Sequence, residues 1–306
     1  MLIYETIPIV ASLISSISRA GLNIVDRHQF KNVATCPIIV GYWNSFLPVV
    51  LIFPLMLFSP AIPYFVEDVI AINVVFLALL IQLVSYSFGY AFSLLRVTDV
   101  AIISKSADIT VPIFLSFFGL YSLHLGVIWV LPLLIFIFIL SAGVKVAKRA
   151  GLASLALVVI LSIQGIYSYF IGFNSSLNKG FWGLLSFATS VLLWRFIFSF
   201  LVMAYRGGFL TAIKFPRDTF SVRGFCIRGL LTVITQVTFL LAISANQLML
   251  VWPILNTTGF TGAIFAYLFL GESLRPKDFV FIFLTFLLTG LVMILLNYEK
   301  FKSLLH

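Results

Sequence analysis

Long apolar runs, separated by short gaps rich in charged residues, Pro or Gly, fill the sequence from end to end. A membrane-spanning helix needs about 20 mostly apolar residues. The cut between the third and fourth runs depends only on Arg96, Thr98 and Asp99, so nine or eleven spans remain alternatives. The pattern predicts an all-α membrane protein with ten transmembrane helices, at residues 3–25, 36–58, 69–95, 97–120, 125–147, 152–173, 181–205, 225–245, 247–270 and 277–297.

The composition agrees with a chain embedded in lipid. Apolar residues make up 62% of the 306 residues and charged residues only 9%, whereas soluble domains usually carry about 25% charged residues. Most basic residues lie in short gaps between apolar runs, as in the cytoplasmic loops of membrane proteins. We therefore expect an integral membrane protein of the bacterial inner (plasma) membrane, which contacts the lipid bilayer and no nucleic acid. The spacing of Cys36 and Cys226 suggests neither a disulfide framework nor a metal site.

The chain is predicted to consist of two copies of a five-helix unit, at 1–150 and 151–306. Trp43 lies in the first unit much as Trp194 lies in the second, and the fourth-segment ending at Gly119 corresponds to the ninth-segment ending at Gly271. An odd number of helices in each copy forces the two copies into opposite orientations. Inverted repeats usually place a substrate site at their interface near the middle of the membrane.

Polar residues recur every three or four positions along several segments, which places them on one helix face. Small and hydroxyl residues in such stripes also serve helix packing, so packing remains an alternative to a cavity. The fifth and tenth segments carry no such stripe, and we expect both helices on the outside, facing lipid. The stripes are Ser12, Ser15, Ser16, Arg19, Asn23 and Asp26; Gln82, Ser85, Tyr86, Gly89 and Ser93; Lys105, Asp108, Pro112, Ser116 and Gly119; Thr232, Thr235 and Gln236; and Trp252, Asn256, Phe260, Ala263 and Tyr267.

Ionised side chains within the spans are the strongest candidates for function, because a charge in mid-membrane is costly. Lys105 and Asp108 are three residues apart and can pair on one helix face. Pro112 should weaken the same helix, while Arg19, near a span end, could instead reach the membrane surface. An ion pair that only fixes packing is the alternative to a binding role. The candidate cavity residues are Lys105, Asp108, Arg19, Arg195, Gln82, Tyr86, Gln236, Trp252 and Asn256.

The ninth segment ends in Leu270-Gly271-Glu272-Ser273-Leu274, which is followed by Pro276 and an apolar tenth segment. With the two five-helix halves, this ending resembles the drug/metabolite transporter superfamily, in particular its EamA-like members, over the whole chain. The resemblance implies a transporter fold built from two EamA-like repeats. The first half departs from the pattern, with Tyr121-Ser122 where Gly-Glu would be expected. Glu272 itself is expected to be structural, in a tight turn before a helix N-terminus.

A second, weaker resemblance lies in Lys105-Ser106-Ala107-Asp108. It is similar to the Lys-x-x-Glu-Pro stretch in the fourth span of the triose-phosphate and nucleotide-sugar transporter branch. Asp replaces Glu here and Ile109 replaces Pro. The ninth segment also lacks the basic pair of the phosphate-translocating relatives, so the resemblance implies transport without naming a substrate.

The sequence thus predicts a secondary transporter that moves a small polar or anionic metabolite by alternating access through a cavity between the repeats. No nucleotide-binding motif is present, so we expect a gradient or exchange to drive it, and no cofactor. Asp108, as the only acidic side chain expected deep in a span, is the candidate for proton coupling. A non-transporting membrane scaffold or subunit is one alternative. An intramembrane lipid-modifying enzyme is another, but His28, His124 and His306 lie at span ends, loops or the terminus, so no enzyme is expected.

The partners expected are a small-molecule substrate and the bilayer, and a homodimer is left open. The loops that follow odd-numbered segments carry most of the basic residues, so the positive-inside rule places those loops in the cytoplasm and both termini outside. Family habit favours the opposite orientation. The basic residues assigned to the odd-numbered loops and their span ends are Arg27, Lys31, Arg96, Lys145, Lys148, Arg149, Arg206, Lys214, Arg217, Arg223, Arg228, Arg275 and Lys277.

Overall fold

The computed structural model describes residues 2–32, 37–119, 126–171, 179–205, 219–244, 251, 254–255, 257–272 and 275–296. Over these residues the chain is helical and forms no strand. The helices are α1 (Leu2–Asn32), α2 (Pro37–Leu57), α3 (Ile62–Ile70), α4 (Ile72–Leu94), α5 (Val97–Ser104), α6 (Ser106–Phe117), α7 (Gly126–Ala142), α8 (Val144–Ile171), α9 (Gly180–Tyr205), α11 (Thr219–Ile243), α13 (Thr258–Leu270) and α14 (Pro276–Leu296).

Seven helical stretches among the described residues are long and apolar enough to cross a membrane. They are Thr6–Gln29, Ile38–Leu57, Ile72–Leu94, Val97–Phe117, Val144–Ile171, Gly180–Tyr205 and Val222–Ile243, and the shorter apolar helices Val127–Ala142 and Thr258–Leu270 accompany them. The prediction of an all-α membrane protein is confirmed at this level. Two details differ from the sequence prediction: α1 continues to Asn32, and the short helix α3 precedes α4.

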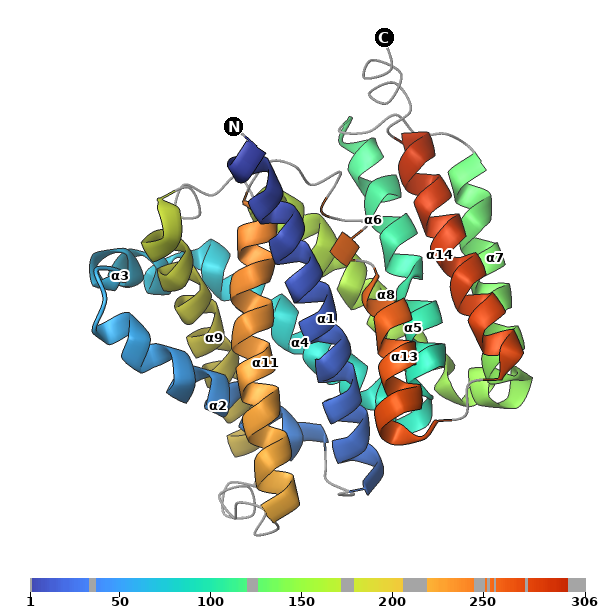
Figure 1. Cartoon of the computed structure of the whole chain (residues 1–306), viewed down its shortest axis with the longest axis horizontal. Helices are drawn as coiled ribbons and strands as arrows, with labels where there is room; N and C mark the ends of the chain where they lie inside the picture. The colour runs from blue at the N-terminus through green and yellow to red at the C-terminus, as the bar shows by residue number, and fades with distance from the viewer. Residues whose placement is uncertain are drawn as a thin grey trace.

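The helices pack in pairs that join the two halves of the chain. Figure 1 shows α1 and α11 running side by side through the middle of the bundle, with α2, α3 and α9 on one side and α7 and α14 on the other. α4 packs against α8, α1 also contacts α13, and α6 contacts α8. α2 contacts both α9 and α11, while α9 contacts α4. Helices from both halves therefore surround the centre of the bundle.

The fourth predicted span is broken at Lys105. Here α5 ends and α6 begins, and the backbone N–H of Lys105 donates to the carbonyl of Ile102 at 3.2 Å, the three-residue spacing of a tighter turn. α6 contains Pro112 and continues through it to Phe117. The break between the two helices therefore lies at Lys105 itself.

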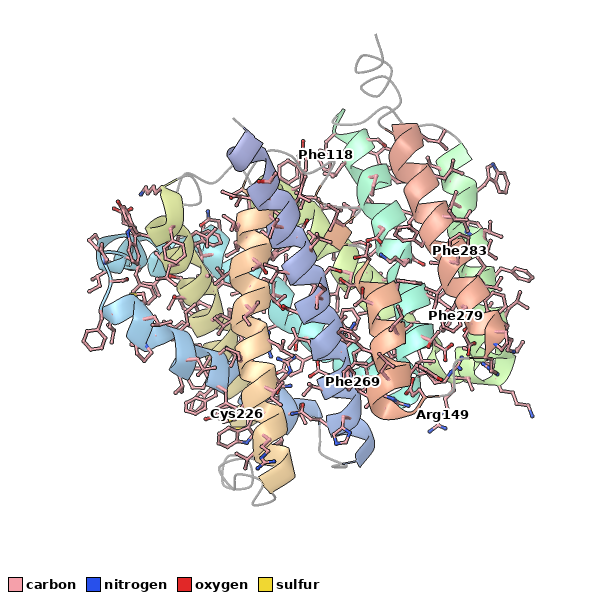
Figure 2. The ribbon with its side chains drawn as sticks, viewed as in Figure 1. Phe118, Arg149, Cys226, Phe269, Phe279 and Phe283 are labelled. Atoms are coloured by element: carbon pink, nitrogen blue, oxygen red, sulfur yellow. The ribbon has the colours of Figure 1, made fainter. Side chains whose placement is uncertain are left out.

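The outer edge of the bundle is formed by α7 and α14, which pack against each other. Their outward side chains are exposed, including Trp129 at 77% and Phe136 at 56%. Phe279 and Phe283 lie on α14 at this edge (Figure 2) and are 45% and 57% exposed. This agrees with the outside position predicted for the fifth and tenth segments, since large apolar side chains without protein contacts suit lipid.

Candidate functional site

A cavity of about 230 Å³ lies between helices of both halves. Its wall is formed by α1, α4, α5, α6, α8, α9, α11 and α13, together with Lys105 and Leu255. Polar positions spaced three or four residues apart on α1 and α11 turn one face of each helix toward it. The charged and amide side chains in the wall are Arg19, Asn23, Asp26, Lys105, Asp108, Gln164, Arg195, Arg228 and Gln236.

One charged group in the wall, which we call the Lys105 pole, consists of Arg19, Lys105 and Asp108. The Lys105 ammonium donates to the Asp108 carboxylate at 3.0 Å, and both side chains are buried. The Arg19 guanidinium lies over the ring of Phe239 at 4.5 Å from its centroid, a cation–π contact. Arg19 therefore lies in the cavity wall, not at the membrane surface, and it forms no ion pair with the other described residues.

A second group, the Arg195 pole, consists of Asp26, Arg195 and Arg228. Arg228 holds the Asp26 carboxylate through two contacts, Nε to Oδ1 at 2.6 Å and Nη2 to Oδ2 at 3.1 Å. This fork geometry is the strong form of an Arg–carboxylate pair. Arg195 donates only to the Oε1 atom of Gln82, at 3.4 Å, and within the described part of the chain it has no carboxylate partner. Ser45 donates to the same Gln82 oxygen at 3.1 Å.

The two poles have the same charge balance. Each contains two cationic side chains and one carboxylate, so the described wall carries two positive charges more than negative ones. Burial of a charge without a partner is unfavourable. The arrangement is therefore suited to bind anions, which would offset the surplus, and it disfavours cations of similar size.

The structure brings five of the nine predicted site residues to the cavity wall: Lys105, Asp108, Arg19, Arg195 and Gln236. Gln82 lies just behind the wall, fully buried, where it accepts hydrogen bonds from Ser45 and Arg195. Tyr86 is not part of the wall; its ring packs against Gly41, where no room is left for a larger residue. Trp252 and Asn256 lie outside the described residues.

Asp26 and Arg228 were missed as site residues. Asp108 is not the only carboxylate in the cavity wall, because Asp26, near the end of its span, is only 7% exposed and faces the same cavity. The position of Asp26 in the polar stripe of the first segment was the sequence feature that could have identified it as a site residue. Arg228 was assigned to a cytoplasmic span end, but it is buried at 4% exposure, one helical turn before Thr232. Its pairing with Asp26 could not be read from local spacing.

The stripe predicted on the ninth segment is displaced by one or two positions. Phe260 and Tyr267 are exposed at 43% and 56%, so they do not face the cavity. Thr258 and Gly259 line it instead. A Cβ added at Gly259 would lie 3.5 Å from Cε of Lys105, an ordinary van der Waals contact, so α13 lies directly beside the Lys105 side chain here.

A separate cluster of ion pairs, the end cluster, lies where α5 and α14 begin, toward the lower end of these helices in Figure 1. Arg96 pairs with Asp99 at 2.9 Å and with Asp278 at 3.0 Å, and Arg275 reaches Asp278 at 3.3 Å. Burial lowers the pKa of Arg96, but the hydrogen bonds to Asp99 and Asp278 outweigh it and raise that pKa overall. The end cluster thus holds two cations and two carboxylates.

Nearby, Arg27 pairs with Glu272 at 3.1 Å and donates to the carbonyl of Phe92. Glu272 follows Gly271, which ends α13 with a positive φ of 60°, so it lies in a turn before α14 as expected, and its carboxylate also reaches α1. Four residues assigned to loops by their charge are therefore held in ion pairs: Arg27, Arg96, Arg228 and Arg275.

Among the described residues, no three His, Cys, Asp or Glu side chains come together as a metal site. The ionised groups of the cavity are instead paired with one another or directed at neutral partners. No protein-family model matches the chain, and no curated protein matches it. The resemblance to drug/metabolite transporters consequently remains an expectation from the residues quoted above.

Proposed function

We propose that the chain is a secondary transporter, which moves a small anionic metabolite by alternating access through the central cavity. The observation that carries the proposal is the charge surplus of the wall, with Arg19 and Arg195 directed at neutral partners only. Intramembrane charges are costly and usually face a pathway or a partner. An anion in the cavity would supply the missing partner.

The packing of the helices supports two inverted five-helix repeats at 1–150 and 151–306. If α1 corresponds to α8, α2 to α9, α4 to α11, α6 to α13 and α7 to α14, most contacts among these ten helices have a counterpart, whereas α1–α4, α7–α8 and α6–α14 have none of similar extent among the described residues. The α1–α11 contact corresponds to α4–α8, α1–α13 to α6–α8, α2–α11 to α4–α9, and α6–α7 to α13–α14. The α2–α9 and α7–α14 contacts map onto themselves. This reciprocity is expected of a two-fold axis between the copies, and it favours membership of an EamA-like fold.

The size of the cavity favours a small solute. At about 230 Å³ it is smaller than the pockets of about 300–1,000 Å³ that hold drug-sized ligands. The polar wall includes the neutral groups of Thr235 and Gln236 beside the charged poles. A metabolite with a few heavy atoms and a net negative charge fits both properties.

The ion pairs at the lower end suit a gate between the halves. Arg27–Glu272 and Arg96–Asp278 each join residues 1–150 to residues 151–306. The pair at the opposite end, Lys179–Glu67, is exposed. In an alternating-access cycle the lower end would open as these partly buried pairs separate, and the positive-inside rule assigns that end to the cytoplasm.

Uptake into vesicles tests the proposal. The purified protein would be reconstituted with radiolabelled succinate, inorganic phosphate or, as a cationic comparison, choline. We expect at least one anion to accumulate above protein-free vesicles, choline to stay outside, and the double variant Arg19→Gln/Arg195→Gln to lose uptake. The exposed Arg149→Gln is the matched control (Figure 2) and should transport normally. Uptake of neither anion, or unchanged uptake by the double variant, contradicts the proposal.

A further inference from the structure

The two poles lie at different heights of the cavity. Arg19 and Asp26, one from each pole, both belong to α1 and are separated by seven residues. At about 1.5 Å per residue, this places the poles about 10 Å apart along the helix axis. Both residues line the same cavity, so the cavity is elongated along α1 with a charged group near each end.

Each pole has its own surplus positive charge. At the Lys105 pole, Asp108 is held by Lys105 and also lies in the field of Arg19. At the Arg195 pole, Asp26 is held by Arg228, while Arg195 lies in the field of both. Coulomb interaction weakens with distance, so one anionic group in contact with one pole leaves the other surplus charge largely uncompensated.

The wall between the poles is neutral. Leu22 and Asn23 follow Arg19 on α1, and both face the cavity. On α11, Thr232, Thr235 and Gln236 lie between Arg228 and Phe239, the residue beneath Arg19. The middle of the cavity therefore offers apolar contacts and neutral hydrogen-bonding groups, but no ionised side chain among the described residues.

We infer that the preferred substrate is a short linear dianion, with an anionic group at each end and a neutral middle, such as an α,ω-dicarboxylate. One end binds Arg19 beside Lys105, and the other end binds Arg195 beside Arg228. A charge-assisted hydrogen bond at each end then offsets both surplus charges. This inference rests on the proposed transport function, and it adds the requirement for two separated anionic ends.

The test compares adipate with its monoamide, which has the same length and one charge fewer. Binding to the purified protein would be measured by calorimetry, with succinate and suberate as shorter and longer diacids. We expect adipate to bind at least about ten-fold more tightly than the monoamide. Arg19→Gln and Arg195→Gln should each reduce this ratio to about one, because each leaves a single pole with surplus charge. Arg195→Lys keeps the charge and should retain a clear preference for the diacid.

The exposed Arg149→Gln serves as control and should keep the full ratio. The inference is overturned by any of three results. Adipate and its monoamide bind equally, no diacid binds, or the ratio of their affinities is undiminished in both Gln variants. Uptake in vesicles distinguishes a failure of the two-ended substrate from a failure of the proposed transport function. If both compounds are transported without preference, the two-ended substrate is wrong and the transporter stands. If adipate binds but no anion crosses the membrane, the transport function is wrong.

Discussion

The charged groups of the cavity and those of the end cluster differ in one property, which is the balance between cations and carboxylates. In the end cluster, Arg96 and Arg275 face Asp99 and Asp278, so cations and carboxylates are equal in number. In each cavity pole there are two cations but only one carboxylate, which pairs with one of them. Balanced groups satisfy one another, while a surplus needs a further partner. The comparison separates ion pairs that hold helices together from charged groups that await a ligand.

The largest expected effect on stability comes from breaking the balanced cluster. Asp278 is completely buried and accepts hydrogen bonds from both Arg96 and Arg275. Asp278→Ala removes the hydrogen bonds from both guanidinium groups and from the backbone N–H of Arg275, so we expect the free energy of unfolding to fall by about 3 kcal/mol. The melting temperature in detergent, followed by tryptophan fluorescence, measures the loss. Glu67→Ala, at an exposed position, is the control, and an equal effect of the two substitutions would contradict the distinction.

A smaller loss is expected at the second pair of the same end. Glu272→Gln keeps the shape of the side chain but removes the charge that Arg27 contacts at 3.1 Å. We expect a loss of about 1–2 kcal/mol, because Arg27 keeps its bond to the Phe92 carbonyl. A double-mutant cycle with Arg27→Gln measures the coupling between the two side chains. Strictly additive effects would show that the pair does not tie α1 to the end of α13.

At the Lys105 pole we expect little change in stability but loss of function. Lys105→Met with Asp108→Leu replaces a buried pair by apolar residues, which is often neutral for folding. The variant should therefore melt within a few degrees of the wild type, yet fail to take up the anion. The single variant Lys105→Met is the comparison and should be less stable, since it leaves the Asp108 carboxylate buried alone.

Lys105→Arg should retain uptake with a changed affinity, because the two cations differ in shape and hydration. If Lys105→Met with Asp108→Leu instead shows full uptake, the Lys105–Asp108 pair serves packing alone.

The smallest effect is expected at the upper end of the bundle. Lys179 donates to Glu67 at 3.0 Å, and this hydrogen bond raises the pKa of Lys179. The stabilisation is present below the ordinary lysine pKa and disappears as the pH rises through the raised value. Both side chains are well exposed, so water and salt screen the pair. Lys179→Gln should leave the melting temperature unchanged at neutral pH, at low and at high salt. A drop of several degrees would show that this end also holds the halves together.

The sequence by itself determined the helical membrane architecture and part of the site. Apolar runs long enough to span lipid leave few alternatives to helices, because every backbone group must be satisfied inside the segment. The same logic identified Arg19, Lys105, Asp108 and Arg195, since ionised residues inside such runs are rare. The spacing of Lys105 and Asp108 was sufficient to predict their pairing, which is local to one helix turn.

Only the tertiary structure decided which distant residues share the cavity. Asp26 and Arg228 are separated by 202 positions, and their pairing depends on the contact between α1 and α11. The pairing of Arg27 and Glu272 also depends on tertiary contacts. From the sequence, Arg27 was assigned to a loop and Glu272 to a turn. Helical periodicity defines which face of one helix is polar, but not which helix that face meets. The packing of the helices alone decides how many cations and carboxylates each cluster contains. It therefore also decides whether a cluster holds helices together or can bind a ligand.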